Sequence, residues 1–285
     1  MKKQKALITG ANTGLGFEMA RELAAQGFHV VIAGRSRTKV DGAIKTIGKE
    51  FPDASLEAGI VDLASLASVK DFAHDFRKNH KQLHILINNA GVMVPPAGRT
   101  EDGFETQFGV NFVAHFALTG HLFDLLNATP NARVITLSSI GHRGASIDFD
   151  NFSLEKDYDP WREYGQSKLA DLMFALEMDH RLRARNSQIL SLAAHPGVSQ
   201  TELTRNLEHI PSNVTFMTPA QGAAPALHAA TSPDVKGGQY WGPDGPDERT
   251  GQPGLAVVDP AALREGEAAR LWDWAQQATG LHFPV

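Results

Sequence analysis

In the stretch Lys5-Ala-Leu-Ile-Thr-Gly-Ala-Asn-Thr-Gly-Leu-Gly16, a short apolar run passes through three glycines into a helical pattern. Residues 5–9 predict a buried strand, and residues 17–24 carry apolar side chains at helical spacing. Glycines in such a turn let the backbone bend tightly and let a diphosphate reach the unpaired amides at the helix N-terminus. A turn that needs glycine only for a positive φ is the alternative. The stretch therefore predicts strand, glycine turn and helix, with a diphosphate site as one of two interpretations.

Strand and helix patterns alternate along the rest of the chain. Apolar runs predict strands at 28–33, 56–61, 83–87, 133–137 and 188–194, and helical spacing predicts helices at 38–50, 69–76, 104–127, 164–185 and 219–231. This alternation predicts an α/β fold, a Rossmann-type doubly wound parallel sheet with helices on both faces.

No linker or internal repeat divides the chain, so residues 1–285 are expected to form a single domain. Three additions to the core are expected. They are an insertion at 142–161, a lid candidate or plain surface helix at 202–218, and a C-terminal extension at 242–285. The extension is expected to start as an exposed Gly/Pro-rich loop at 242–254 and to end in a packed helix.

Composition excludes several classes of protein. The 285 residues carry a net charge of −5, which offers no basic field for nucleic acid. The chain has no cysteine, and its 12 histidines show no metal-ligand spacing such as His-Glu-x-x-His. The N-terminal Met-Lys-Lys-Gln-Lys is too short and polar for a signal sequence, and no apolar run approaches the ~20 residues that cross a bilayer. We therefore expect a cytoplasmic protein with no metal and no membrane anchor.

The segment after the second predicted strand bears on the choice of cofactor. In a dinucleotide-binding fold, an acidic residue here holds the ribose 2′-hydroxyl, whereas arginine accommodates a 2′-phosphate. The segment contains Arg35 and Arg37, and no Asp or Glu occurs between Glu22 and Asp41. This pattern favours NADP(H), with Arg35 and Arg37 as the clamp; ordinary solvated arginines at a helix start are the alternative.

Polar residues follow several of the predicted strands. Parallel strands place their carboxyl ends on one edge of the sheet, where ligands bind. The residues at these ends are Asp62 and Leu63, Asn88 to Gly91, Ser139, and His195 to Thr201. Turn formers and helix caps have the same composition, so each is ambiguous alone. Asn111 lies inside an apolar helix, where a buried amide needs hydrogen-bond partners.

Tyr164 and Lys168 are four residues apart at the start of an apolar helical pattern. On a helix this spacing places the phenol and the ammonium on one face. A cation beside a phenol favours its ionised form, which suits acid–base catalysis. The same spacing also occurs on ordinary solvated helices, so the surrounding motifs decide between the two interpretations.

From about residue 5 to 231 the chain resembles the short-chain dehydrogenase/reductase family. The matching residues occur in the family's order: the glycine motif at 9–16, Asp62, Asn88 to Gly91, Asn111, Ser139, Tyr164 with Lys168, and Pro196-Gly197 followed by Thr201. Tyr164 lies 25 positions after Ser139, a separation that exceeds the family's usual dozen or so. With Tyr164-Gly-Gln-Ser-Lys-Leu-Ala, His195-Pro-Gly-Val and Gly238-Gln-Tyr240, this separation resembles the retinol-dehydrogenase-like branch. Members of that branch often carry an N-terminal membrane anchor; none is evident here, so membrane residence and retinoid substrates are not carried over.

The resemblance implies that NADP(H) lies across the strand ends. The implied cofactor-binding residues are Gly10, Asn12, Thr13, Gly14, Leu15, Gly16, Arg35, Arg37, Asp62, Leu63, Asn89, Ala90, Gly91, Tyr164, Lys168, Pro196, Gly197, Val198 and Thr201. The implied catalytic residues are Asn111, Ser139, Tyr164 and Lys168. Ser139 and Tyr164 would bind the substrate oxygen, and Tyr164 would transfer the proton. Lys168 would hold the nicotinamide ribose, and Asn111 would order a water that relays protons.

The expected function is NADP(H)-dependent interconversion of a carbonyl and an alcohol on an apolar small molecule. Met93, Val94, Leu203, Phe216 and Met217 are candidates for an apolar substrate pocket, with Ser139 on the substrate oxygen; packing residues are the alternative. A non-catalytic NADP(H)-binding regulatory or interaction protein remains open, as does reduction of an activated carbon–carbon double bond. By resemblance, a homodimer or homotetramer would form through the helices that contain Asn111 and Tyr164, unless the insertion blocks it.

Overall fold

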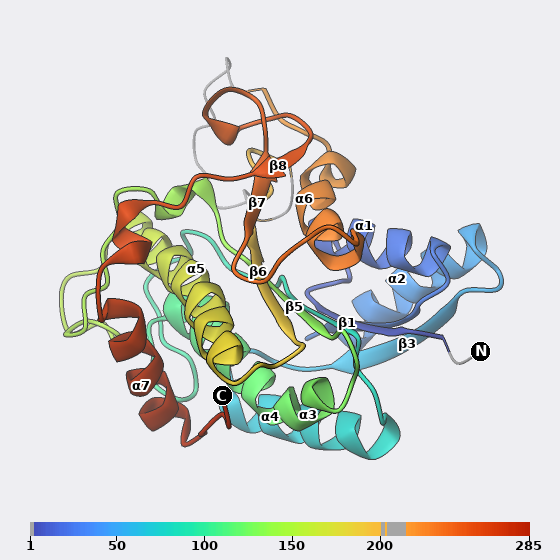
Figure 1. Ribbon diagram of the computed structural model, residues 1–285, viewed down its shortest axis with the longest axis horizontal. Helices are drawn as coiled ribbons and strands as arrows, with labels where there is room; N and C mark the ends of the chain where they lie inside the picture. Colours follow the sequence, from blue (N-terminus) through green and yellow to red (C-terminus); the bar gives the residue numbers. More distant parts are fainter. Residues whose placement is uncertain (1–2, 201–202, 204–214) are drawn as a thin grey trace.

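The computed structural model describes residues 3–200, 203 and 215–285, and its centre is one eight-stranded sheet (Figure 1). The strands are β1 (Lys5–Thr9), β2 (His29–Gly34), β3 (Ser55–Ile60), β4 (Ile85–Asn88), β5 (Arg133–Leu137), β6 (Leu190–Ala194), β7 (Tyr240–Pro243) and β8 (Pro253–Leu255). Their order is β3-β2-β1-β4-β5-β6-β7-β8, and each neighbouring pair is parallel except β7 with β8. The order reverses between β1 and β4, which is where sheets of this type bind their ligands.

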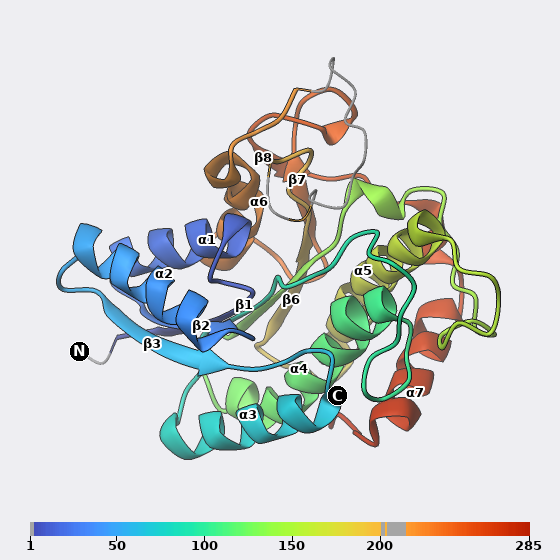
Figure 2. The ribbon, with the colours of Figure 1, turned by 180° about the vertical axis from the view of Figure 1, so that it is seen from behind.

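Helices cover both faces of the sheet, so the expected doubly wound α/β fold is confirmed (Figures 1 and 2). One face carries α1 (Gly14–Ala25), α2 (Arg37–Glu50) and α6 (Pro219–Thr231). The other carries α3 (Leu66–Asn79), α4 (Ala114–Asn127) and α5 (Pro160–Ala184), with α7 (Glu267–Thr279) outside α5. Successive residues of a strand point to opposite faces of the sheet. In β1, Ala6 and Ile8 therefore pack on the face that carries α1, α2 and α6, and Leu7 packs on the face that carries α3, α4 and α5.

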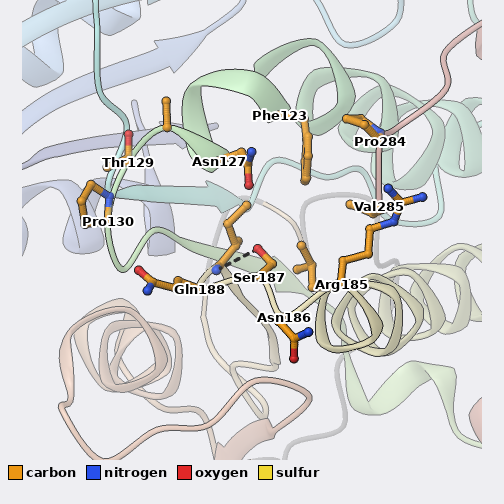
Figure 3. Close-up of a pocket in the computed structure, with 13 residues that line it drawn as sticks. Phe123, Asn127, Thr129, Pro130, Arg185, Asn186, Ser187, Gln188, Pro284 and Val285 are labelled. Carbon is orange, nitrogen blue, oxygen red and sulfur yellow. Dashed lines mark hydrogen bonds between the residues drawn. The ribbon is translucent and has the colours of Figure 1, made fainter.

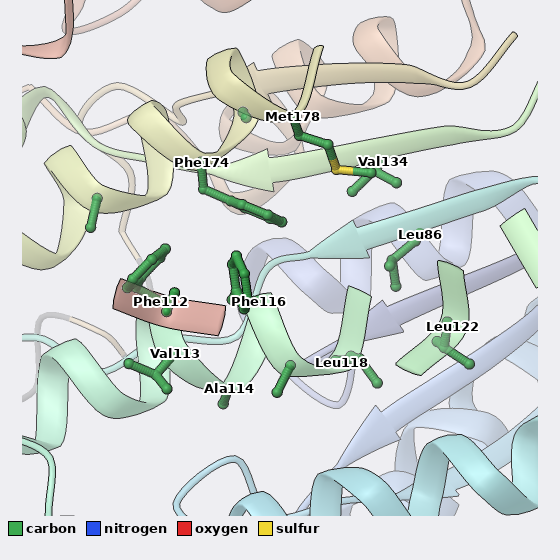
Figure 4. Packing of buried hydrophobic residues seen from close by; sticks show 14 of the residues in the cluster. Leu86, Phe112, Val113, Ala114, Phe116, Leu118, Leu122, Val134, Phe174 and Met178 are labelled. Carbon is green, nitrogen blue, oxygen red and sulfur yellow. The ribbon is translucent and has the colours of Figure 1, made fainter. Parts of the chain in front are cut away.

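The helix expected at 104–127 begins later and in a different form. Residues Phe108–Val113 form a π-helix, η1, which continues into α4. The Glu105 carboxylate accepts hydrogen bonds from the backbone N of Gln107 at 2.9 Å and of Phe108 at 2.7 Å, so it caps this start. An apolar pattern that surrounds a helix does not reveal a wider turn, and such turns occur frequently at functional sites. Figure 4 shows how Phe112 and Phe116, from η1 and α4, pack against α5.

The stretch 242–254 was expected to be an exposed loop, and that expectation is partly wrong. Its two ends belong to β7 and β8, which pair as an antiparallel ladder with Trp241 opposite Leu255. Proline is tolerated there because edge strands and bulges can spare a ladder donor. Between the two strands lies a short helical turn, η4 (Pro246–Glu248). Two further short turns are η2 (Ile140–His142) and η5 (Pro260–Leu263), and the expected packed C-terminal helix is α7.

The C-terminal segment covers the outer face of α4 and α5. The Trp272 ring stacks on Phe174 with centroids 5.8 Å apart and meets Phe116 edge-on at 5.1 Å. Phe283 lies 4.7 Å from Phe116 and packs closely against Gly120. The homodimer or homotetramer expected through these helices stays a prediction, and its surface is already occupied by this chain's own residues.

A cavity of about 440 Å³ opens at the amino ends of β5 and β6 (Figure 3). Asn127 to Pro130 lead into β5 and Asn186 to Ile189 lead into β6, and both segments line it together with Val285. It lies at the opposite edge from the strand ends that carry the predicted site residues. None of the described helices is long and apolar enough to cross a membrane.

Candidate active site

The glycine turn after β1 packs directly against the chain that leaves β4. Gly10 has φ +64°, and a methyl group on it would lie 2.9 Å from Ala90 Cα. A methyl group on Gly16 would lie 2.6 Å from Asn89 Nδ2, which itself donates to the Thr9 carbonyl at 2.7 Å. Any side chain at either glycine would therefore force the two segments apart. The turn leads into α1 at Gly14, and the amides of its first turn lie at the carboxyl edge of the sheet.

A buried chain of hydrogen bonds holds together the glycine turn after β1 and the segment after β4. The Thr9 hydroxyl accepts from the backbone N of Asn89 and of Ala90, both at 3.0 Å, and lies 2.8 Å from His115 Nε2. His115 Nδ1 lies 2.7 Å from the Asn111 carbonyl oxygen. These partners suit a neutral ring that donates from Nδ1 and accepts at Nε2. Burial lowers the pKa of His115 to about 4, and Lys168 adds to the shift.

Asn111 lies in η1, and its side-chain amide is fully engaged. Oδ1 accepts from Val92 N at 2.8 Å, while Nδ2 donates to Val92 O at 3.0 Å and to Ser167 Oγ at 2.9 Å. The π-turn thus ties the segment after β4 to α5. The predicted role of Asn111 in ordering a water stays a prediction; its observed contacts position Val92 and Ser167.

Ser139 and Tyr164 meet beside Gly141. Ser139 follows β5 and caps η2, with its Oγ accepting from Gly141 N at 3.1 Å. A methyl group on Gly141 would lie 2.9 Å from the Tyr164 ring and 3.4 Å from Ser139 Oγ. The turn therefore places the serine hydroxyl next to the phenol ring. Because Ser139 Oγ accepts from Gly141, its own hydrogen is free to be donated to a ligand.

Lys168 lies one helical turn after Tyr164 on α5, is buried, and has two hydrogen-bond partners. Its Nζ donates to the Leu137 carbonyl at 2.9 Å and to Asp171 Oδ2 at 2.9 Å. Burial favours the neutral amine, but the charges of Asp171 and Tyr164 outweigh it and raise the pKa of Lys168. Burial likewise raises the pKa of Asp171 to about 7, against the effect of Lys168. Asp171 was not among the predicted site residues, although its i+3 spacing from Lys168 places both on one helix face.

The cofactor candidates along β2 and β3 lie at the same edge. Arg35 follows β2, is exposed, and makes no hydrogen bond or ion pair with any described residue. Arg37 differs, because its Nε is paired with Asp41 at 3.0 Å. Asn12 approaches Gly34 closely at the end of β2. Asp62 Oδ1 accepts a hydrogen bond from Ala64 N at 3.0 Å. This contact is typical of a turn-forming residue, which was the alternative interpretation of Asp62.

Other cofactor candidates complete the rim. Thr13 is the residue before α1 and makes no side-chain cap. Leu15 packs against Gly222 of α6, and Leu63 is buried beside β3. The segment from His195 to Gln200 follows β6, as expected, and Val198 pairs with Met217. Thr201 and most of the lid candidate 202–218 lie outside the described residues.

The substrate side contains both predicted and additional apolar residues. Met93 and Val94 follow β4, and Met93 is buried. Leu203 and Met217 flank the undescribed segment. Trp161, which the sequence did not single out, is 57% exposed and meets the Tyr164 ring edge-on at 6.4 Å. An exposed indole beside the phenol offers an apolar wall for a ligand.

Within the described part of the chain, one group brings potential metal ligands together at the opposite edge of the sheet: His29, Glu57 and His80. Glu57 lies 2.9 Å from His29 Nε2 and 3.1 Å from His80 Nε2. Lys5 Nζ contacts the other nitrogen of His80, so this ring already has a hydrogen-bond partner on each side. Sequence spacing did not reveal the group, because the three residues come from β2, β3 and the end of α3.

Comparisons with known proteins agree with this arrangement. The family described as short chain dehydrogenase matches residues 4–211. Retinol dehydrogenase 13 of Mus musculus is 38% identical over 289 residues, covering 96% of this chain and 83% of that protein. Polyprenol dehydrogenase of Homo sapiens is 36% identical over 243 residues, covering 81% of this chain and 74% of that protein.

Two solved structures have the same fold. An uncharacterised protein from Mycobacterium Paratuberculosis has a TM-score of 0.84 at 36% identity, covering 99% of this chain and 95% of that one. A short chain dehydrogenase from Shigella flexneri, solved with NADP, has a TM-score of 0.67 at 21% identity, covering 84% and 96%. The second likeness is one of fold alone. With the family match over residues 4–211, these relatives show that the chain belongs to the short-chain dehydrogenase/reductase family, in its retinol-dehydrogenase-like branch.

Proposed function

We propose that the protein is an NADP(H)-dependent oxidoreductase that interconverts a carbonyl and an alcohol on an apolar small molecule, with Tyr164 as proton donor and acceptor. The observation that carries the proposal is the meeting of Ser139, Tyr164 and Lys168 at the carboxyl edge, beside the glycine turn. As a member of its family the protein is an oxidoreductase of alcohols or their carbonyl counterparts. The cofactor preference and the roles of individual residues are the new part of the proposal.

NADP(H) supplies or accepts the hydride when bound. The residues fit such a ligand: Gly10 and Gly16 have no room for a side chain, and the turn between them leads into α1, whose N-terminal amides suit a diphosphate. Arg35 is exposed and free of partners among the described residues, so it suits a 2′-phosphate. Asn89 to Gly91, together with Pro196 to Val198, would border the nicotinamide.

Proton transfer rests on this chain's own residues. The Ser139 hydrogen is available to the substrate oxygen, which holds that oxygen beside Tyr164. The Tyr164 hydroxyl gives its proton to that oxygen in reduction and takes it back in oxidation. Lys168 lies one helical turn after Tyr164 on α5, and its raised pKa keeps it positively charged beside the site of proton transfer.

An apolar substrate is the class that the surroundings support. Trp161 and Met93 lie on the substrate side, and the relatives' names specify retinol and polyprenol, both apolar alcohols. A small-molecule carbonyl or alcohol, without nucleic acid, is therefore the proposed partner. The cytoplasmic location and the single-domain organisation of residues 1–285 stay predictions.

The test measures oxidation of NADPH, and separately of NADH, against apolar ketones and aldehydes of increasing size. Turnover with NADPH should be lost in Tyr164→Phe, while its affinity for NADPH changes by less than about threefold, because the hydroxyl acts on the substrate. Tyr158→Phe is the matched control, since it also removes one hydroxyl, which donates to the Pro95 carbonyl at 2.6 Å. This control should keep most of its turnover.

Three results would redirect the proposal. Near wild-type turnover in Tyr164→Phe would contradict its role as proton donor. NADPH binding without turnover of any carbonyl would favour a non-catalytic regulatory protein. Turnover restricted to conjugated carbonyls, with loss of the double bond in the product, would identify reduction of an activated carbon–carbon double bond.

A further inference from the structure

We propose that Glu248 is a positioning residue that joins the Ser139 turn after β5 to the His195–Val198 loop after β6, and so fixes the two sides of the reaction site relative to each other. The inference deepens the proposed function and rests on it. Glu248 lies in the connection between β7 and β8, within the C-terminal extension. It is 53 residues from His195 and 105 from Arg143, the two side chains that it bridges.

The Glu248 carboxylate receives three donors from three segments. Oε2 accepts from Arg143 Nη2 at 2.7 Å and from His195 Nε2 at 2.9 Å. Oε1 accepts from the backbone N of Val257 at 2.8 Å, which anchors the carboxylate to the chain after β8. The carboxylate side chain is only 13% exposed, so water competes little for these bonds.

His195 links Glu248 to the loop at 195–198, which is predicted to border the nicotinamide. The ring is fully buried, and its Nδ1 accepts from Gly197 N at 3.2 Å, so the ring proton resides on Nε2 and is donated to Glu248. Burial lowers the pKa of His195 to about 4, although Glu248 opposes the shift, so the ring is neutral near pH 7. Glu248 thereby selects the tautomer that holds the Gly197 amide.

Arg143 links Glu248 to the turn that follows Ser139. It directly follows η2, whose N-terminus is capped by Ser139 through the backbone N of Gly141. Besides its bond to Glu248, Arg143 donates from Nη1 to the Asp247 carbonyl at 3.0 Å. The guanidinium therefore donates to the Glu248 side chain and to the backbone of the neighbouring Asp247.

The backbone is arranged for this contact. Asp247 and Glu248 have φ values of +54° and +56°, in the left-handed region that residues other than glycine rarely adopt. Such conformations persist where surrounding contacts enforce them, and they concentrate at functional sites. Arg249 O accepts from Val198 N at 2.8 Å and lies where a side chain on Gly197 would stand. The segment 247–249 thus lies directly on the loop that it positions.

The test compares hydrogen–deuterium exchange and kinetics in Glu248→Gln, Glu248→Ala and the control Asp247→Asn. In Glu248→Gln one oxygen becomes an NH₂ group, so three donors face a single acceptor oxygen and Arg143 loses its charge partner. Asp247→Asn removes the neighbouring exposed carboxylate from the same backbone conformation, which asparagine tolerates.

We expect exchange in residues 139–145 and 195–200 to accelerate at least tenfold in Glu248→Ala and by an intermediate factor in Glu248→Gln. Turnover should show a kcat reduced tenfold or more and a smaller change in KM for NADPH, because the Glu248 side chain bonds to Arg143, His195 and Val257 and not to the glycine turn at 10–16. Asp247→Asn should match the wild type within twofold in both measurements.

Unchanged exchange in both loops, or equal acceleration in β1 and α1, would overturn the positioning role. Exchange reports on Glu248 without any reaction. If the wild type turns over no carbonyl but the two loops still loosen in Glu248→Ala, the proposed function fails and the structural connection stands.

Discussion

Replacement of His115 by glutamine should change how the stability of the protein depends on pH. His115 is buried between Thr9 and the Asn111 carbonyl, and its pKa is lowered to about 4 by burial. In the unfolded chain its pKa returns to about 6.5. Between these values the unfolded state binds a proton that the folded state refuses, so the contribution of His115 is fully present above pH 6.5 and is lost as pH falls toward 4.

The size of the effect follows from the two pKa values. At pH 4.5, protonation of the unfolded chain lowers the free energy of unfolding by about 2.5 kcal/mol relative to pH 7. The whole-protein curve would conceal this loss. His195 acts in the same direction, whereas Glu105 and Asp171, whose pKa values are raised to about 7, act in the opposite one. The difference between wild type and His115→Gln isolates the single group.

Urea unfolding of both proteins at pH 7.0, 6.0, 5.0 and 4.5 measures that difference. Glutamine retains a donor and an acceptor but does not titrate, so the advantage of the wild type should shrink by about 2.5 kcal/mol across the series. His74→Gln, at an exposed position on α3, is the control substitution. A difference for His115→Gln that stays within about 0.5 kcal/mol at every pH would refute the assignment of a buried neutral imidazole.

Three further predictions concern the cofactor clamp, the start of η1 and the lysine pair. Arg35→Ala should weaken NADPH by about 10- to 100-fold, as expected for lost charge-assisted hydrogen bonds, and NADH by less than twofold; equal losses in fluorescence titrations would exclude a 2′-phosphate clamp. Because the folded pKa of Glu105 is raised to about 7, Glu105 should cost the wild type up to about 3 kcal/mol of stability as pH rises from 4.5 through 7. Glu105→Gln should not show this loss. Parallel pH dependences of the free energy of unfolding for the two proteins, measured at pH 5 and 8, would contradict this. Asp171→Ala should lower the free energy of unfolding by about 3–5 kcal/mol by leaving the Lys168 ammonium unpaired, and Asp171→Asn should cost less; equal losses in urea unfolding would show that the carboxylate is not the partner that matters.

The expectations that succeeded rest on local patterns. The strand at 133–137 and the helix at 219–231 were predicted at their observed bounds, because apolar period and the Thr218-Pro219 cap are encoded in adjacent residues. The stretch 242–254 was partly misjudged for the same reason. Its glycines and prolines favour turns, while the pairing of Trp241 with Leu255 depends on a sheet edge that is built elsewhere in the chain.

Local patterns along the chain predicted the α/β fold and most of the residues that lie at the carboxyl edge, because parallel strands bring whatever follows them to one side of the sheet. The hydrogen-bond partners of these residues could be identified only in the folded chain. The hydrogen bonds of Glu248 with Arg143 and His195 join three segments that are distant in the sequence. Likewise, the packing of α7 on α5 could not be assigned from local patterns. Strand and helix periods act over a few residues, whereas a hydrogen bond or a buried charge depends on tenths of an ångström set by the packing of the whole chain.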